Sequence, residues 1–160
     1  MGEERSRTVR VGVISDTHGL LRPEAAAALS GCSRIVHAGD VGTEDVLEAL
    51  RRIAPVAAVR GNVDVGPPLS RLPETLQLEL AGHRVLVLHD RSQLRAEPRA
   101  AGLAAVISGH THRSGVSRAD GVLFVNPGSA GPRRFHLPVS VAILTLSPRG
   151  LHARVVVLDV

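Results

Sequence analysis

The stretch Val9-Arg-Val-Gly-Val-Ile-Ser-Asp-Thr-His-Gly19 joins a β-branched apolar run to a short polar segment. Val9–Ile14 therefore predicts a buried strand, and the residues after it predict a loop. A similar order recurs twice in the next 45 residues: Ile35–Ala38 ends at Gly39-Asp40, and Val56–Arg60 ends at Gly61-Asn62. We expect three strands of one sheet, each followed by a loop that carries an Asp or Asn.

Two helices are predicted between these strands. Pro23–Leu29 begins with a Pro, which suits the first helical turn, and continues with Glu and four Ala. Thr43–Ile53 begins with a capping residue, has acidic residues at its start and has Arg51 and Arg52 near its end. Strands that alternate with helices favour a parallel sheet with the helices outside it.

The pattern changes after the Pro-rich loop Gly66–Pro73. Thr75–Leu80 and Arg84–His89 flank Ala-Gly-His and predict a hairpin, and Ser92–Ala101 predicts a weak helix that Pro98 interrupts. Further short strands are predicted, the last four as a meander: Ala104–Ile107, Gly115–Arg118, Val122–Val125, Val139–Leu146 and Leu151–Val160. This order fits either one mixed sheet or two stacked sheets, with helices on the outer faces.

Composition excludes several classes of protein. The chain has 160 residues, of which 44% are hydrophobic, so one domain with a large core is expected over residues 9–160, after a flexible tail at 1–8. No apolar run approaches the roughly 20 residues that span a bilayer, and we expect no signal peptide. Cys32 is the only cysteine, which excludes internal disulfides. We predict a cytoplasmic protein that does not bind membranes.

The basic charge does not predict a nucleic-acid partner. All 19 basic residues counted as Lys or Arg are Arg, and the formal charge is only +4. Phe124 and Phe135 are the only aromatic residues of the Phe, Trp and Tyr type, so no platform exists on which bases could stack. We therefore expect no dedicated nucleic-acid binding.

Metal-ligating residue types follow five of the predicted strands. In open α/β sheets, sites lie beyond the carboxyl ends of the strands, which would bring these residues together. Asp16 and His18, like His110 and His112, are two positions apart, which in extended chain places both side chains on one face about 6.6 Å apart. His37, inside a buried run, is interpreted instead as a hydrogen-bonded core residue. The candidate ligands are Asp16, His18, Asp40, Asn62, His89, His110 and His112.

This ligand chemistry predicts a two-metal site. Carboxylate, amide and imidazole ligands without a thiolate suit Mn, Fe, Co, Ni or Zn better than Ca or Mg. Seven ligands are too many for one tetrahedral ion, whereas two divalent ions about 3.5–4 Å apart that share a carboxylate would use them. Two ions, two carboxylates and a hydroxide leave a charge of +1, for which a phosphate anion is a suitable guest.

These motifs, in this order, resemble those of the calcineurin-like metallophosphoesterase superfamily. Gly61-Asn62-Val63-Asp64 and Asn126-Pro-Gly-Ser129 resemble its small prokaryotic phosphodiesterase subgroup. The resemblance implies a four-layer α/β/β/α sandwich of two stacked mixed sheets with outer helices. It also implies a dinuclear phosphodiesterase or phosphatase that hydrolyses a small phosphate ester by in-line attack of a metal-bridging hydroxide.

The resemblance assigns Asp16, His18 and His112 to one metal ion and Asn62, His89 and His110 to the other, with Asp40 bridging the two. Catalytic roles fall to Asp40, Asn62 and His110, and substrate binding to Asn62 and to Arg133 or its neighbour Arg134. Mn is the first choice of metal, with Ni, Fe, Zn and Co as alternatives.

Two positions depart from the superfamily pattern: Asp90 stands where Gly usually follows the motif His, and Val63 stands where many members have a proton-donating His. Asp90 could perturb a ligand or point outward. The physiological substrate and the oligomeric state, including a homo-oligomer, stay open.

Two other functions compete with that of a phosphoesterase. A non-catalytic interaction scaffold similar to the retromer subunit would have lost part of the ligand set, whereas every ligand position is filled here. A hydrolase of the metallo-β-lactamase type would need Asp-His after His110-Thr-His112, and Ser114 and Gly115 stand there.

Overall fold

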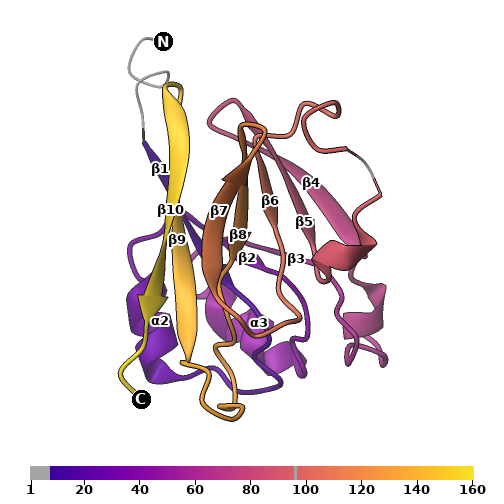
Figure 1. Ribbon diagram of the computed structural model, residues 1–160. Coiled ribbons are helices and arrows are strands. Elements are labelled where there is room, and N and C mark those ends of the chain that lie inside the picture. Colours follow the sequence, from indigo (N-terminus) through magenta and orange to yellow (C-terminus); the bar gives the residue numbers. More distant parts are fainter. Residues whose placement is uncertain (1–7, 96) are drawn as a thin grey trace.

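The computed structural model describes residues 8–95 and 97–160, and it consists of two five-stranded mixed sheets (Figure 1). Of the tail predicted over residues 1–8, residues 1–7 therefore lie outside the described part of the chain. The first sheet has the order β10-β9-β1-β2-β3, and the second has the order β4-β5-β6-β8-β7. The two stacked sheets confirm the predicted α/β sandwich.

The first sheet begins with the predicted strand–helix alternation. Its strands are β1 (Val9–Ile14), β2 (Arg34–His37), β3 (Val56–Ala58), β9 (Ser140–Ser147) and β10 (Gly150–Val157). β1 pairs in parallel with β2, and β2 pairs in parallel with β3. The carboxyl ends of all three strands therefore lie at one edge of the sheet. Helix α2 (Pro23–Leu29) connects β1 to β2, and α3 (Glu44–Arg51) connects β2 to β3.

Two details of α3 differ from the prediction. The helix is shorter than Thr43–Ile53, and Thr43 occupies the N-cap position without making a side-chain hydrogen bond there. The helix is held instead by its buried face, on which Val46, Leu47 and Leu50 pack against the first sheet.

The second sheet contains the predicted hairpin. Its strands are β4 (Thr75–Leu80), β5 (His83–Leu88), β6 (Ala105–Ile107), β7 (Gly115–Ala119) and β8 (Val122–Asn126). Ala81 and Gly82 both have positive φ, as a two-residue turn between twisted strands requires. β5 and β6 run in parallel, so their carboxyl ends also meet at one edge.

The four last strands do not form the predicted meander. β7 and β8 pair with each other in the second sheet, whereas β9 and β10 pair with each other in the first. The segment 127–138, which contains Pro127, Pro132 and Pro138, carries the chain from one sheet to the other. Pro lacks the N–H that a strand ladder needs, which explains why no strand continues through this segment.

Apolar side chains from both sheets form the central core. Val13, Val36 and Leu144 of the first sheet pack with Val87 and Ile107 of the second, and all five are buried. A second apolar cluster joins the outer face of the first sheet to α2 and α3. Burial between the layers thus fixes the relative positions of the strand ends that carry the candidate ligands.

The outer face of the second sheet is covered by an irregular segment. The prediction of a helix at Ser92–Ala101 is wrong. Among the described residues this segment contains only a 3₁₀ turn η2 (Arg91–Gln93) and turns at residues 98–102. Pro98 supplies no backbone N–H and disfavours helical backbone in the residue before it. Leu94 and Leu103 from this segment cover Phe124 and its neighbours on the sheet. Among the described residues, no helix has both the length and the apolar character needed to cross a bilayer.

Candidate metal centre

Loops from both sheets meet at the carboxyl ends of β1, β2, β5 and β6. Backbone hydrogen bonds join the first two loops, from Asp16 N to Gly39 O (3.0 Å) and from His18 N to Asp40 O (3.0 Å). Gly109 N donates to His89 O (2.9 Å), which joins the loops after β5 and β6. The backbone of His110 donates to Asp16 Oδ2 (3.0 Å) and thereby links the two sheets.

Ligand-type atoms from these loops lie in two overlapping groups. Asp16, His18 and His112 form one group, and Asp16, Asp40 and His89 form the other, with the atoms of each within 4.8 Å of one another. Asp40 Oδ2 lies 3.7 Å from His18 Nε2 and 3.3 Å from His89 Nε2. Both carboxylates therefore lie between the two sets of imidazoles.

The backbone at these residues is not extended, contrary to the prediction from their spacing. Five candidate ligands have positive φ, between 46° and 73°: Asp16, His18, Asp40, His110 and His112. Residues other than Gly rarely adopt this conformation, and it concentrates at functional sites. The left-handed turns direct side chains from adjacent loops toward a common point.

Unpartnered buried atoms show that the centre fits a metal. Among the described residues, five buried side-chain N or O atoms lack a hydrogen-bond partner, and four of them belong to this cluster: Asp16 Oδ1, His18 Nε2, His89 Nε2 and His112 Nδ1. Burial of a polar atom without a partner is costly, and such atoms usually coordinate metals or bind water. Carboxylate and imidazole atoms grouped in this way would be satisfied by divalent cations.

The two carboxylates differ in their electrostatics. Asp16 is fully buried, and burial raises its pKa although the Ser15 hydroxyl and the imidazoles of His89 and His112 oppose the shift. Burial also acts to raise the pKa of Asp40, but the adjacent His89 imidazole and the Val63 N–H outweigh it and hold this pKa far below its usual range. Asp40 is therefore ionised at neutral pH without a metal.

The hydrogen bond of His89 fixes which of its nitrogens faces the centre. Nδ1 lies 2.7 Å from the carbonyl oxygen of Ala38 and must donate to it, so Nε2 is the nitrogen that faces the carboxylates. Burial lowers the pKa of His89, but its contacts with Asp40 and the Ala38 carbonyl raise it overall. Burial lowers the pKa of His112, which favours the neutral, ligating form.

Asn62 and His110 lie at the rim of the centre and belong to neither group. Asn62 is exposed, and the His110 side chain is 41% exposed, with its ring packed edge-on against that of His89. Asp90 does not point outward: its Oδ2 lies 3.7 Å from His110 Nε2, and its Oδ1 accepts from the backbone and hydroxyl of Ser92.

Arg133 and Arg134 are the two candidates for phosphate binding, and of these Arg134 influences the electrostatics of a residue of the centre. Burial is the largest cause of the lowered pKa of His112; the Asp16 carboxylate opposes this shift, and the charge of Arg134 adds to it. Arg133 is exposed, with no side-chain hydrogen bond or ion pair among the described residues.

Val63 stands where many members of the superfamily have a proton-donating His. Its backbone N–H donates to Asp40 Oδ1 (3.0 Å).

Asp64 is a structural residue to which the sequence pattern alone assigned no role. Its buried carboxylate accepts from the backbone N–H groups of Val41 (3.2 Å), Gly42 (3.0 Å) and Gly61 (2.9 Å). It therefore ties the loop after β2, which carries Asp40, to the loop after β3, which carries Asn62. In the sequence, the feature that could have pointed to this residue is its place as the last position of the Gly-Asn-x-Asp motif.

His37 is confirmed as a hydrogen-bonded core residue. Its Nδ1 accepts from Gly39 N (3.1 Å), so Nε2 carries the proton that is donated to Thr17 Oγ1 (3.0 Å). The Thr17 hydroxyl in turn donates to Val41 O (2.8 Å). This chain of bonds requires a neutral imidazole, and burial lowers the pKa of His37 to about 4.

The chain is similar in sequence to proteins of one known family. The family model for the calcineurin-like phosphoesterase superfamily domain matches residues 9–149. A probable metallophosphoesterase of Methanothermobacter thermautotrophicus is 35% identical over 162 residues, covering 91% of each chain.

Solved structures share the fold at lower identity. Vacuolar Protein Sorting 29 of Cryptosporidium parvum has a TM-score of 0.80 and 22% identity, with 95% of this chain and 92% of the other covered. A structure described as a novel archaeal phosphodiesterase has a TM-score of 0.78 and 23% identity, with 93% and 99% covered.

Replacing Asp64 tests its role in holding the two loops. We expect Asp64→Ala to lower the free energy of unfolding by about 3 kcal/mol, because three backbone N–H groups lose their acceptor. Asp64→Asn, which keeps one acceptor oxygen, should cost less. Urea unfolding with EDTA present measures both, and Asp159→Ala, at an exposed carboxylate, is the control. A loss in Asp64→Ala no larger than in the control would contradict the assignment.

The pH dependence of stability tests the neutral state of His37. Between about pH 6.5 and 4, the unfolded state binds a proton that the folded imidazole does not, so stability falls as the pH is lowered. Between pH 7.5 and 4.5 the free energy of unfolding should fall by about 2–3 kcal/mol more in the wild type than in His37→Gln. Urea titrations of the EDTA-treated proteins measure this difference. Parallel pH profiles for the two proteins would refute it.

Proposed function

The chain belongs to the calcineurin-like phosphoesterase superfamily, and from this membership we propose that it is a metal-dependent phosphodiesterase acting on a small phosphate ester. The observation that carries the proposal is the cluster of buried, unpartnered carboxylate and imidazole atoms at the joined strand ends. A site built only for structure would have paired these atoms with one another or with the backbone.

The proposed centre holds two divalent ions. Asp16, His18 and His112 would hold the first, and His89, Asn62 and His110 the second. Asp40 would contact both, in keeping with the position of its Oδ2 between His18 and His89. Asn62 and His110 complete the second set from the rim, where both are accessible to solvent. Mn suits this oxygen and nitrogen set, and Ni, Fe, Zn and Co are the alternatives.

When bound, such ions supply positive charge for the phosphoryl oxygens and lower the pKa of water toward about 7, so that an in-line attacking hydroxide is available at neutral pH. The chain supplies the positions of the groups around them. Asp40, which the His89 imidazole and the Val63 N–H keep ionised, contributes negative charge between the two sets of imidazoles. The Asn62 amide and His110 face the open side, where a phosphate would approach, and Arg134 or Arg133 adds positive charge nearby.

Charge at the centre favours a phosphate ester over a neutral substrate. Two divalent ions exceed the charge of the two carboxylates, and the remaining positive charge attracts an anion. Transition states of phosphoryl transfer spread negative charge over the non-bridging oxygens, which a site of this charge stabilises. We further propose a cytoplasmic location and no dedicated nucleic-acid or membrane partner.

A non-catalytic scaffold is the second candidate function. The fold shared with Vacuolar Protein Sorting 29 is compatible with it, since fold alone does not determine activity. The complete ligand set favours catalysis. A scaffold would hydrolyse no phosphate ester whatever metal it holds, so an activity screen on protein whose metal content has been measured separates the two.

Two substitutions test the phosphodiesterase directly. In the Mn-loaded protein, Asp40→Asn and His110→Ala should each lower kcat/KM on bis(4-nitrophenyl) phosphate by at least about 100-fold, because each removes a proposed ligand. Asp120→Asn and His152→Ala make the same chemical changes at exposed positions outside the centre and should leave the activity unchanged. Circular dichroism establishes that every variant is folded. Full activity in folded Asp40→Asn and His110→Ala would refute the mechanism.

A further inference from the structure

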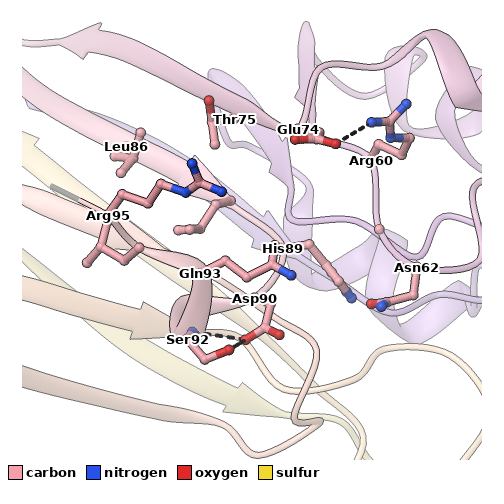
Figure 2. A pocket seen from close by; sticks show the side chains of 13 residues that line it. Arg60, Asn62, Glu74, Thr75, Leu86, His89, Asp90, Ser92, Gln93 and Arg95 are labelled. Atoms are coloured by element: carbon pink, nitrogen blue, oxygen red, sulfur yellow. Dashed lines mark hydrogen bonds and ion pairs between the residues drawn. The ribbon is translucent and has the colours of Figure 1, made fainter.

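A cavity of about 860 Å³ opens beside the metal centre. Asn62 and His89 line the end at the centre, and Thr75 of β4 and Leu86 of β5 line the part that leads away from it. The opposite wall comes from the irregular segment after β5, from which Gln93 and Arg95 extend toward the cavity in Figure 2.

The cavity is larger than a phosphate group requires. Its volume lies within the roughly 300–1,000 Å³ of sites that hold drug-sized ligands. Leu86, Leu88 and Leu94 give it apolar surface, which a phosphate alone would not contact. A phosphate ester bound at the centre would therefore have room for its alcohol portion in the cavity.

The charged side chains in the wall differ in whether they are already paired. Arg60 Nη2 lies 2.6 Å from Glu74 Oε1, and its Nη1 donates to Ser70 O (2.9 Å). Asp90 accepts from Ser92 and faces His110. Within residues 8–95 and 97–160, Arg95 makes no ion pair and no side-chain hydrogen bond. Its guanidinium is therefore available to a ligand.

An available guanidinium in such a cavity selects for a particular chemistry. Arg presents a planar fork of donors that matches carboxylate and phosphate oxygens, and its bonds to such anions are stronger than neutral hydrogen bonds. Asp90, at the metal end of the cavity, disfavours a second anion there. In Figure 2 the Arg95 guanidinium lies apart from Asp90, with the Gln93 side chain between them in this view.

We infer that this cavity binds the alcohol portion of the substrate and that Arg95 recognises a carboxylate or second phosphate on that portion. The inference rests on the proposed function and narrows it to phosphate esters that carry an additional anionic group. Leu86 and Leu88 would contact the carbon skeleton between the two anionic ends. Arg95 is thus a specificity-determining residue and takes no part in hydrolysis itself.

Two substrates that differ only in whether their aryl groups carry carboxylates or neutral amides test the inference. Bis(4-carboxyphenyl) phosphate and bis(4-carbamoylphenyl) phosphate have similar size and the same ester bonds, but only the first carries additional anions. With the Mn-loaded protein we expect kcat/KM to favour the carboxylate ester by about tenfold. In Arg95→Gln this ratio should fall toward one, whereas Arg99→Gln, an exposed Arg of the same segment that does not line the cavity, should retain it.

A binding measurement separates this inference from the proposed function. Isothermal titration of the same proteins with 4-carboxyphenylphosphonate and 4-carbamoylphenylphosphonate reports on recognition without hydrolysis. Tighter binding of the carboxylate that depends on Arg95 supports the inference even if neither ester is hydrolysed, and that outcome would contradict the proposed function alone. Equal binding of the two phosphonates, equal turnover of the two esters when both are hydrolysed, or a preference that survives Arg95→Gln would overturn the inference.

Discussion

The structure depends on two buried carboxylates that the surrounding chain holds among imidazoles. Asp16 is fully inaccessible and Asp40 nearly so, and burial of such charge is costly unless it is compensated. Because the compensating imidazoles lie on other loops, the loops that carry Asp16 and Asp40 must lie close to them. A Cβ at Gly61 would collide with the Asp40 carboxylate, and one at Gly109 would collide with Ser15 and Asp16. The absence of a side chain at both positions lets separate loops share one small volume.

Much of the fold and most of the centre follow from the sequence. Val9–Ile14 and the next two apolar runs predict parallel strands, and parallel strands place their carboxyl ends at one edge. The order of strands and loops in the sequence is therefore enough to predict that Asp16 and Asp40 lie close together. His89 and His112 belong to the other sheet, and their approach depends on stacking of the two sheets, which the pattern left open beside a single mixed sheet.

Other features could not be predicted because long-range contacts decide them. The extended spacing assumed for Asp16 and His18 failed because the chain turns into left-handed backbone, held by hydrogen bonds to the loop after β2. The role of Asp64 depends on backbone N–H groups in its own loop and in the loop after β2, and the Gly-Asn-x-Asp motif alone does not reveal the contacts with the second loop. The missing helix at Ser92–Ala101 shows tertiary context and Pro98 overriding a weak propensity.

We propose that two metal ions bind next to each other around a shared carboxylate. Electron paramagnetic resonance of the protein titrated with Mn²⁺ tests it most directly, because two ions about 3.5–4 Å apart couple magnetically and isolated ions do not. We expect two bound ions per chain with the spectrum of a coupled pair, and loss of the coupling in Asp40→Asn. A single bound ion at saturation, or two that give only isolated-ion spectra, would contradict it.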